Sequence, residues 1–223
     1  MITTKEYTDF SEPSMRMKEY TVTGVVLKTT TKETYAFPET VKRLPFWTTA
    51  PRETFARSLN QRGCEVTVYP ADTPAEKVLA GKPDGIMLSN GPGDPKENTA
   101  IIREVKKLYE SDVPIFAICL GHQLISLACG ANTVKLKFGH RGCNHPVVNL
   151  ATGKVEITSQ NHGYAVEAES LAGTQLEMTH QVITRRVWRV SAISNIRFSV
   201  CSTIRRLHRG RRMRTICLMH SWN

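Results

Sequence analysis

Residues 64–130 alternate between short apolar runs and amphipathic stretches, and this alternation constrains the fold more than any other feature of the chain. Strands are expected at 64–71, 84–90 and 113–119, and helices at 73–83, 98–112 and 121–130. Strands that alternate with helices predict a parallel sheet with right-handed crossovers, and therefore an α/β fold. Ligands of such sheets bind beyond the carboxyl ends of the strands. Further upstream, residues 17–36 are rich in Thr and Val and predict one or two more strands.

The charge of the chain is concentrated at one end. The net charge is +10, yet residues 1–180 contain 20 Lys and Arg against 20 Asp and Glu, while residues 181–223 contain ten Arg and no acidic residue. A nucleic-acid-binding tail is one explanation, but this segment lacks a basic motif with interleaved aromatic residues, so a solvated tail is favoured. No apolar run of membrane-spanning length and no secretory signal is visible, and six cysteines without a Cys-x-x-Cys pair predict a cytoplasmic protein with free thiols.

Cys119 stands where an apolar strand turns into a helix, in the stretch PIFAICLGHQL. A sharp strand-to-helix turn exposes its side chain, and the N–H groups of the helix N-terminus favour a thiolate. Gly121 allows the backbone to turn closely, and a neighbouring N–H can hold an oxyanion. The sequence therefore predicts a nucleophile, although a buried structural cysteine is an equally good reading of the position taken alone.

A second candidate element is the segment NGPGDP, directly after the expected strand at 84–90. Gly91 and Gly93 permit positive φ angles and close approach of the backbone to a ligand. A plain glycine-proline turn explains the same residues. Because this segment and Cys119 both follow strands, we expect them at the same edge of the sheet.

Four segments together resemble the class I glutamine amidotransferases in order and spacing: LSNGPGDP, FAICLGHQL, KFGHRGCNHPV and TSQNHGYAV. The last two resemble the branch that forms the small chain of carbamoyl-phosphate synthase, and argue against the anthranilate and guanylate branches. The resemblance is close over residues 56–180 and looser over 10–40. It implies a flavodoxin-like fold with helices on both faces of a mostly parallel sheet.

The resemblance also implies a mechanism and a set of site residues. Cys119 would attack the carboxamide of L-glutamine, release ammonia and form a thioester that water hydrolyses. The N–H groups of Leu120 and Gly93 would form the oxyanion hole. Glutamine contacts are implied for Gly91, Gly93, Leu120, Gln123, Asn161, Gly163 and Tyr164, the last at a position where phenylalanine is also common.

The same resemblance implies the partners. Ammonia would pass to a large chain, in a heterodimer or a higher assembly, which makes carbamoyl phosphate for arginine or pyrimidine synthesis. ATP and Mg²⁺ would belong to that large chain, so this chain is expected to hold no cofactor and no metal. The segment GHRGCNH has metal-binding residue types, but no family role supports a metal there. We expect neither a membrane nor a nucleic acid as a partner.

One catalytic element of the family is missing. Its general base lies in a His-Pro-Glu segment near the C-terminus, and no such segment occurs in this chain. Back-translation of residues 187–222 permits a shifted frame that contains QYHPEAAPGPED, and that of residues 44–55 permits AFLDYGAKGNI. We therefore interpret residues 41–55 and 182–223 as frame-shifted segments.

These observations predict three parts of the chain. Residues 1–40 are a remnant of an N-terminal domain and linker, 41–181 are the amidotransferase domain, and 182–223 are a frame-shifted basic tail. The N-terminal domain is expected to be largely absent. The sheet is expected to be incomplete at its first strand and at its C-terminal end, with weak or no glutaminase activity. An alternative hypothesis is a defective pseudoenzyme that only binds glutamine or the large chain.

Overall fold

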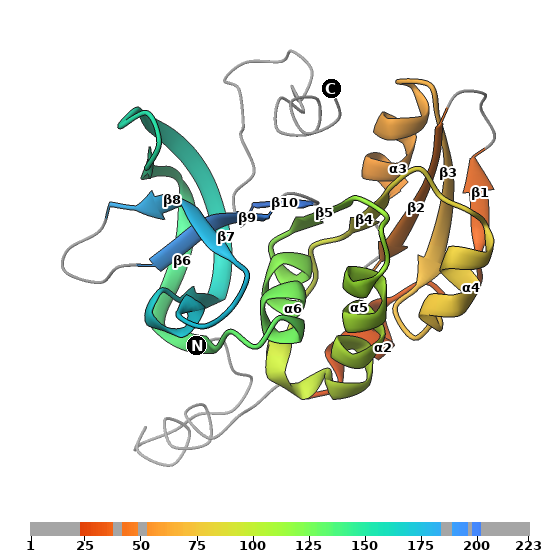
Figure 1. Ribbon diagram of the computed structural model, residues 1–223, viewed down its shortest axis with the longest axis horizontal. Helices are drawn as coiled ribbons and strands as arrows, with labels where there is room; N and C mark the ends of the chain where they lie inside the picture. The colour runs from red at the N-terminus through yellow and green to blue at the C-terminus, as the bar shows by residue number, and fades with distance from the viewer. Residues whose placement is uncertain (1–22, 38–41, 49–52, 184–188, 196–197, 202–223) are drawn as a thin grey trace, which may run out of the picture.

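The computed structural model describes residues 23–37, 42–48, 53–183, 189–195 and 198–201 (Figure 1). The helices are α2 (Val25–Thr29), α3 (Glu53–Asn60), α4 (Ala75–Ala80), α5 (Thr99–Glu110) and α6 (Leu120–Ala128), with short 3₁₀ turns η1 (Pro95–Glu97) and η2 (Glu169–Leu171). The strands are β1 (Tyr35–Phe37), β2 (Lys42–Thr48), β3 (Cys64–Pro70), β4 (Ile86–Leu88), β5 (Ile115–Ile118), β6 (Thr133–Asn149), β7 (Val155–Glu167), β8 (Glu177–Val182), β9 (Arg189–Asn195) and β10 (Phe198–Cys201).

The described strands form one sheet in the order β1-β3-β2-β4-β5-β10-β9-β7-β6-β8. Its centre, β3-β2-β4-β5-β10, is parallel, and the strands on either side pair antiparallel. The expected α/β fold with a parallel sheet is therefore confirmed for this centre. Figure 1 shows the parallel part with its helices on one side of the molecule and the β6–β9 strands on the other.

Alternating side chains of the central strands fill two cores. On β4, Ile86 and Leu88 pack beneath α4, α5 and α6, whereas Met87 faces the opposite core with Leu59 of α3. All these side chains are nearly fully buried. A parallel strand that is buried on both faces requires a continuous apolar run, as the sequence of β4 and β5 provides.

The expectation that the sheet lacks its first strand is wrong for this structure. β2 lies between β3 and β4 and pairs parallel with both. Its apolar run supplies both cores, because Leu44 and Phe46 face the α3 side and Trp47 faces the other. The apolar residues of this segment are sufficient for a central strand, even though the segment was interpreted as frame-shifted. Pro45 is nevertheless unusual there, since proline cannot donate to a strand ladder.

The expectation of missing late strands is also wrong. The tail predicted from residue 182 onward contains β9 and β10, and β10 pairs parallel with β5 over Phe198–Cys201. Backbone hydrogen bonds pair strands irrespective of side chains, so a short apolar segment can take this place. The predictions for residues 1–22, 38–41, 49–52, 184–188, 196–197 and 202–223 lie outside the described residues.

The strand expected within 17–36 is only partly present. β1 begins at Tyr35, but residues 25–29 form helix α2, which follows Gly24 at φ +61°. The helix is held by tertiary packing, since Val26 is buried in the core and Thr30 donates through Oγ1 to the carbonyl of Thr48 at 2.7 Å. Such packing overrides the weak helix preference of β-branched residues.

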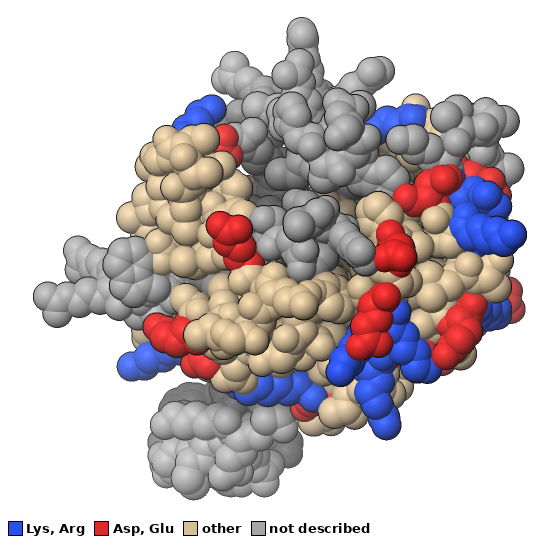
Figure 2. Space-filling model, in the orientation of Figure 1, with Lys and Arg blue, Asp and Glu red and all other residues tan. Residues whose placement is uncertain are grey.

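Charged side chains on the helix-covered surface are of both signs (Figure 2). Between α4 and α5, the Lys107 ammonium lies 2.9 Å from Glu76 and 3.0 Å from Glu104. Within the described ranges, no helix is long and apolar enough to cross a membrane.

Candidate functional site

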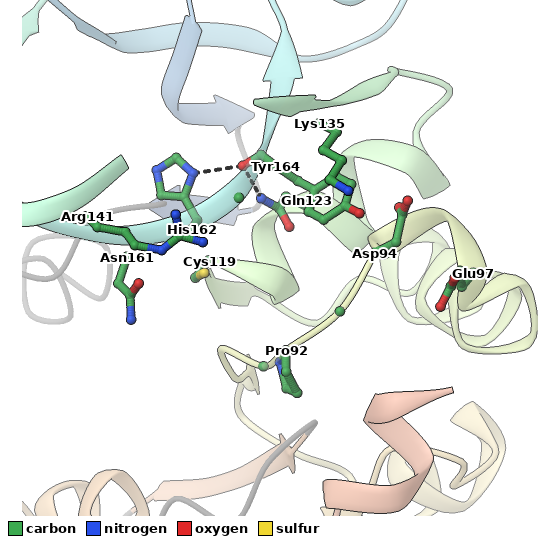
Figure 3. Close-up of a pocket in the computed structure, with 13 residues that line it drawn as sticks. Pro92, Asp94, Glu97, Cys119, Gln123, Lys135, Arg141, Asn161, His162 and Tyr164 are labelled. Atoms are coloured by element: carbon green, nitrogen blue, oxygen red, sulfur yellow. Dashed lines mark hydrogen bonds between the residues drawn. The ribbon is translucent and has the colours of Figure 1, made fainter. Parts of the chain in front are cut away.

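A pocket of about 460 Å³ lies beyond the carboxyl ends of β4 and β5, where the sequence predicted it. Three elements surround it: the loop after β4, the first turn of α6, and the β6–β7 hairpin (Figure 3). Its lining consists of Gly91, Pro92, Gly93, Asp94, Glu97, Cys119, Gln123, Lys135, Arg141, Asn161, His162, Gly163 and Tyr164.

Cys119 occupies a strained turn between β5 and α6. Its φ of 51° and ψ of −104° lie outside the regions that residues with a Cβ adopt readily, at a typical cost of about 1–3 kcal/mol. Its carbonyl accepts the first helical hydrogen bond, from the Gln123 N–H at 3.1 Å. The side chain is thereby held at the helix N-terminus, where the helix dipole favours a negative charge.

Gly121 lets helix α6 approach the end of β4 closely. Its N–H donates to the carbonyl of Ser89 at 3.1 Å, and a Cβ at this position would lie 2.7 Å from the Leu88 carbonyl oxygen. Only glycine fits such a contact without a shift of the backbone. The sequence predicted that Gly121 lets the backbone turn closely, and the structure adds that it allows this close approach to Leu88.

The loop after β4 presents its backbone to the pocket. Gly93 has φ +93°, a conformation that favours glycine, and a Cβ there would lie 3.7 Å from that of Val25 in α2. Asp94 follows and caps η1, because its Oδ1 accepts from the Lys96 N–H at 2.9 Å. The loop therefore has a defined shape, with Gly91 and Gly93 directed at the pocket lining.

The β6–β7 hairpin forms the opposite wall. Arg141 and Asn161 stand directly opposite each other in the register, next to the pair His140 and His162. Register shifts on both sides of this stretch reorient the strands locally, as β-bulges do. The Gln123 side chain of α6 joins this wall by donating from Nε2 to the Tyr164 carbonyl at 2.7 Å.

His162 is the histidine in the pocket lining, but its ring nitrogens are already engaged. Nδ1 donates to the Tyr164 carbonyl at 2.8 Å, and Nε2 lies 3.1 Å from Oε1 of Gln160. Both ring nitrogens thus face oxygen atoms of the β6–β7 hairpin, so taking up a thiol proton would require the ring to give up one of these contacts.

His122 follows Cys119 by three residues but is almost fully buried and does not line the pocket. Burial, and secondarily the nearby His162, lowers the pKa of His122 to about 3. An imidazole with such a low pKa is too weak a base to take a thiol proton efficiently near neutral pH. His122 therefore does not meet the requirements of the missing base.

The structure brings together almost all the residues that the sequence predicted. Seven of them line the pocket, namely Gly91, Gly93, Cys119, Gln123, Asn161, Gly163 and Tyr164. Leu120 is buried directly behind Cys119 as the first residue of α6, where only its backbone can contribute to the pocket.

Sequence reasoning missed six lining residues: Pro92, Asp94, Glu97, Lys135, Arg141 and His162. Most of them lie inside the four segments quoted above, so those segments indicated the right part of the chain. A motif does not show, however, which of its side chains faces the pocket. Two of the six are acidic and two are basic, and the pocket is therefore lined by both signs of charge.

Histidines of the β6–β7 hairpin gather beside the pocket. The rings of His140 and His145 are 5.2 Å apart, and those of His140 and His162 are 5.1 Å apart. Within the part of the chain that the structure describes, no group of three or more His, Cys, Asp or Glu side chains could hold a metal ion.

Comparison with known proteins identifies the family. The model of the class-I glutamine amidotransferase family matches residues 51–201, about two thirds of the chain. The chain belongs to the class-I glutamine amidotransferases. A crystal structure of a glutamine amidotransferase from Thermotoga maritima shares this amidotransferase fold at a TM-score of 0.57 and 11% identity, covering 73% of this chain and 75% of that one.

Among amidotransferases, the chain is similar in sequence to carbamoyl phosphate synthase small chains. That of Bacillus cereus is 54% identical over 165 residues, which cover 74% of this chain and 45% of the relative. That of Listeria innocua is 54% identical over 146 residues, covering 66% of this chain and 40% of the relative. The chain therefore spans less than half the length of the curated relatives that it matches.

Proposed function

We propose that this amidotransferase is the glutamine-hydrolysing part of a carbamoyl phosphate synthase small chain. The observation that carries the proposal is the convergence of Cys119, at its strained turn, with Gly93, Gln123, Asn161 and Tyr164 in one pocket. The small-chain relatives support it through their identity. The mixed charges of the lining also suit a substrate such as L-glutamine, which carries both an ammonium and a carboxylate group.

In the proposed reaction, the Cys119 thiolate attacks the carboxamide carbon of glutamine and forms a tetrahedral intermediate. The N–H groups of Leu120 and Gly93 hold the oxyanion while it forms. Protonation of the nitrogen and cleavage of the C–N bond release ammonia and leave a glutamyl thioester. Water then attacks the thioester, which yields glutamate and returns the thiolate. Gly91, Gln123, Asn161, Gly163 and Tyr164 hold the substrate.

The ammonia would serve a large-chain partner, in a heterodimer or higher assembly, and ATP and Mg²⁺ would act in that partner rather than in this chain. The reaction needs a base for the Cys119 thiol, and neither His162 nor His122 meets that requirement. We therefore propose that turnover is weak, because loss of a general base typically costs about 10²- to 10⁴-fold in rate. The second candidate function is glutamine binding without hydrolysis. It is favoured by the same observation, that both ring nitrogens of His162 already have partners in the hairpin.

A glutamine analogue that carries a chloroketone in place of the carboxamide tests substrate binding and the nucleophile together. Incubation of the full chain, followed by peptide mass spectrometry, should place the adduct on Cys119, and excess L-glutamine should protect it. Cys119→Ser should remove the adduct, whereas Cys143→Ser, at an exposed cysteine outside the pocket, should leave it unchanged. Labelling without protection by glutamine would overturn the proposed substrate.

The frame-shift interpretation is tested by a second chain in which residues 44–55 and 187–222 are replaced by the shifted-frame sequences. We expect this restored chain to hydrolyse glutamine about 10²- to 10⁴-fold faster, because it regains the His-Pro-Glu segment. Cys119→Ser in the restored chain is the matched control and should abolish the gain. Equal turnover by the two chains would contradict the interpretation. It would also be contradicted if DNA sequencing found no shift of the reading frame at either segment while turnover of the unmodified chain stayed low.

A further inference from the structure

Side chains of opposite charge border one end of the pocket. Lys135 of β6 lines it on the hairpin side, and Asp94 and Glu97 line it on the side of the loop after β4. In Figure 3 the Lys135 side chain extends toward this loop, and Tyr164 lies between these charges and Cys119. The charged end of the pocket is therefore separate from the nucleophile.

These charges are available to a ligand. No ion pair between described residues involves Lys135, Asp94 or Glu97. Asp94 is used in part, because its Oδ1 accepts from the Lys96 N–H at 2.9 Å. A carboxylate can nevertheless accept further hydrogen bonds, since its two oxygens together offer about four acceptor positions.

The backbone positions that carry the charges are fixed on both sides. Lys135 stands directly opposite Tyr164 in the register of β6 and β7, and the Tyr164 carbonyl accepts from Gln123 Nε2 at 2.7 Å. Lys135 is thereby tied to helix α6. On the other side, the Asp94 carbonyl accepts from Asn98 Nδ2 at 2.8 Å. The positive and the negative groups therefore start from defined places around the pocket.

The second basic residue of the lining, Arg141, is placed differently. Its Nη1 donates to the carbonyl of Phe138 at 2.9 Å. Figure 3 shows it beside Asn161, on the Cys119 side of the pocket. Lys135 is therefore the basic residue that an anionic group would meet at the end away from the nucleophile.

We propose that Lys135 and Asp94, together with Glu97, select a free amino acid as the substrate. The Lys135 ammonium attracts its α-carboxylate, and the acidic side chains attract its α-ammonium group. This inference rests on the proposed function, in which the carboxamide of glutamine lies at Cys119 and the α-groups consequently lie at the other end. A glutamine residue within a peptide has amide groups in both places and lacks both charges.

Alkylation of Cys119 in the full chain by the chloroketone analogue of glutamine tests the role of Lys135, because this analogue has free α-groups. Lys135 is exposed to water, so Lys135→Met should raise the half-maximal concentration only about two- to fivefold, and the maximal rate should hardly change. With a second analogue, whose α-carboxylate is converted to a carboxamide, the same substitution should have almost no effect.

Asp94→Asn tests the acidic side. Asparagine keeps the shape of the side chain and the cap of η1 but removes the charge. The half-maximal concentration of the free analogue should again rise about two- to fivefold, whereas that of an analogue with an acetylated α-amino group should stay nearly the same. In the unmodified chain, both blocked analogues should need higher concentrations than the free one, which tests the inference without any substitution.

Lys137→Met is the matched control, because Lys137 lies two residues further along β6 and does not line the pocket. It should leave the half-maximal concentration unchanged, and Lys135→Arg should retain most of the affinity for the free analogue. Because salt screens exposed charges, the effect of Lys135→Met should shrink in about 0.5 M NaCl. Iodoacetamide reports the thiol alone and should alkylate Cys119 at the same rate in all these chains.

The outcomes separate this inference from the proposed function. The inference is overturned if Lys135→Met has no effect with the free analogue, or an equal effect with the carboxamide analogue. An equal effect of Lys137→Met, or a slower reaction of the Lys135→Met chain with iodoacetamide, would also overturn it. In each of these cases L-glutamine would still protect Cys119, and the proposed function would stand. If L-glutamine protects none of the chains, the proposed function fails and the inference fails with it.

Discussion

Gln123 Nε2 donates to the Tyr164 carbonyl at 2.7 Å, and this bond joins the helix of the candidate nucleophile to the opposite wall of the pocket. The donor side chain is only 4% exposed, so water can hardly replace it. The two walls of the pocket are therefore parts of one hydrogen-bonded unit, and mutations at this junction should affect stability and chemistry together.

Gln123→Met should test this junction, because methionine has a similar length and cannot donate. We expect a loss of about 1 kcal/mol in the free energy of unfolding, since the Tyr164 carbonyl keeps its bond from His162. Denaturant unfolding measures the loss, and alkylation of Cys119 should slow in parallel. Gln175→Met, at a surface position bonded to Tyr109, should change stability by less than about 0.5 kcal/mol. Equal effects of the two substitutions would contradict the assigned role.

Gly121→Ala should be strongly destabilising. The added methyl group would lie 2.7 Å from both the Cβ and the carbonyl oxygen of Leu88, and backbone atoms cannot yield as a flexible side chain can. Overpacking of this kind typically costs about 1–3 kcal/mol. Gly81→Ala is the control, because its φ is −71° and its nearest contact would be an ordinary 3.5 Å. Thermal melts of both variants decide the point, and a Gly121→Ala chain as stable as the control would refute the close contact.

His122 should make the protein sensitive to acid. Burial lowers its pKa to about 3 in the folded chain, against an ordinary value of 6.5 that applies when the chain is unfolded. Between these values the unfolded chain binds one more proton, so stability is retained above pH 6.5 and lost as the pH falls toward 3. The contribution of His122 to the change of the free energy of unfolding with pH should approach about 1.4 kcal/mol per pH unit.

The His122→Leu variant removes this titration and the buried ring nitrogens that have no hydrogen-bond partner. Denaturant unfolding at several pH values between 3 and 7 should therefore show a slope reduced by about one proton relative to the unmodified chain. An unchanged slope would mean that the acid sensitivity has another source.

Pro45→Val should stabilise the sheet. The N–H and carbonyl of Arg43 bond to Asp84, and the carbonyl of Trp47 accepts from the Ser89 N–H, so these groups of β2 face β4. Every second residue of a strand directs its backbone groups to the same side, and the Pro45 nitrogen therefore also faces β4. Valine would supply the N–H that proline lacks, and we expect a gain of about 1 kcal/mol in the free energy of unfolding. A lower unfolding midpoint for the variant than for the unmodified chain would show that the ladder does not need this donor.

The sequence predicts the pocket well and the edges of the fold poorly. Cys119 and Gly93 lie in motifs that follow strands, and the ends of neighbouring parallel strands necessarily meet. In contrast, the first strand was expected to be missing because residues 41–55 were interpreted as frame-shifted. Helix α2 formed from β-branched residues because Val26 is buried at 1% exposure. Arg141 could not be assigned to the pocket beforehand, because its direction depends on the bulged register opposite Asn161.

The parallel pairing of β10 with β5 shows that parts of a protein differ in how strongly they depend on side-chain identity. The ladder that holds Phe198–Cys201 in place is made of peptide groups, which every residue except proline supplies in full. A catalytic pocket does not tolerate such substitution, because a general base acts only when the right side chain lies within reach of the proton it takes. A chain of this family can therefore keep its sheet when side chains of such a strand change, whereas a change of one side chain in the pocket can remove catalysis.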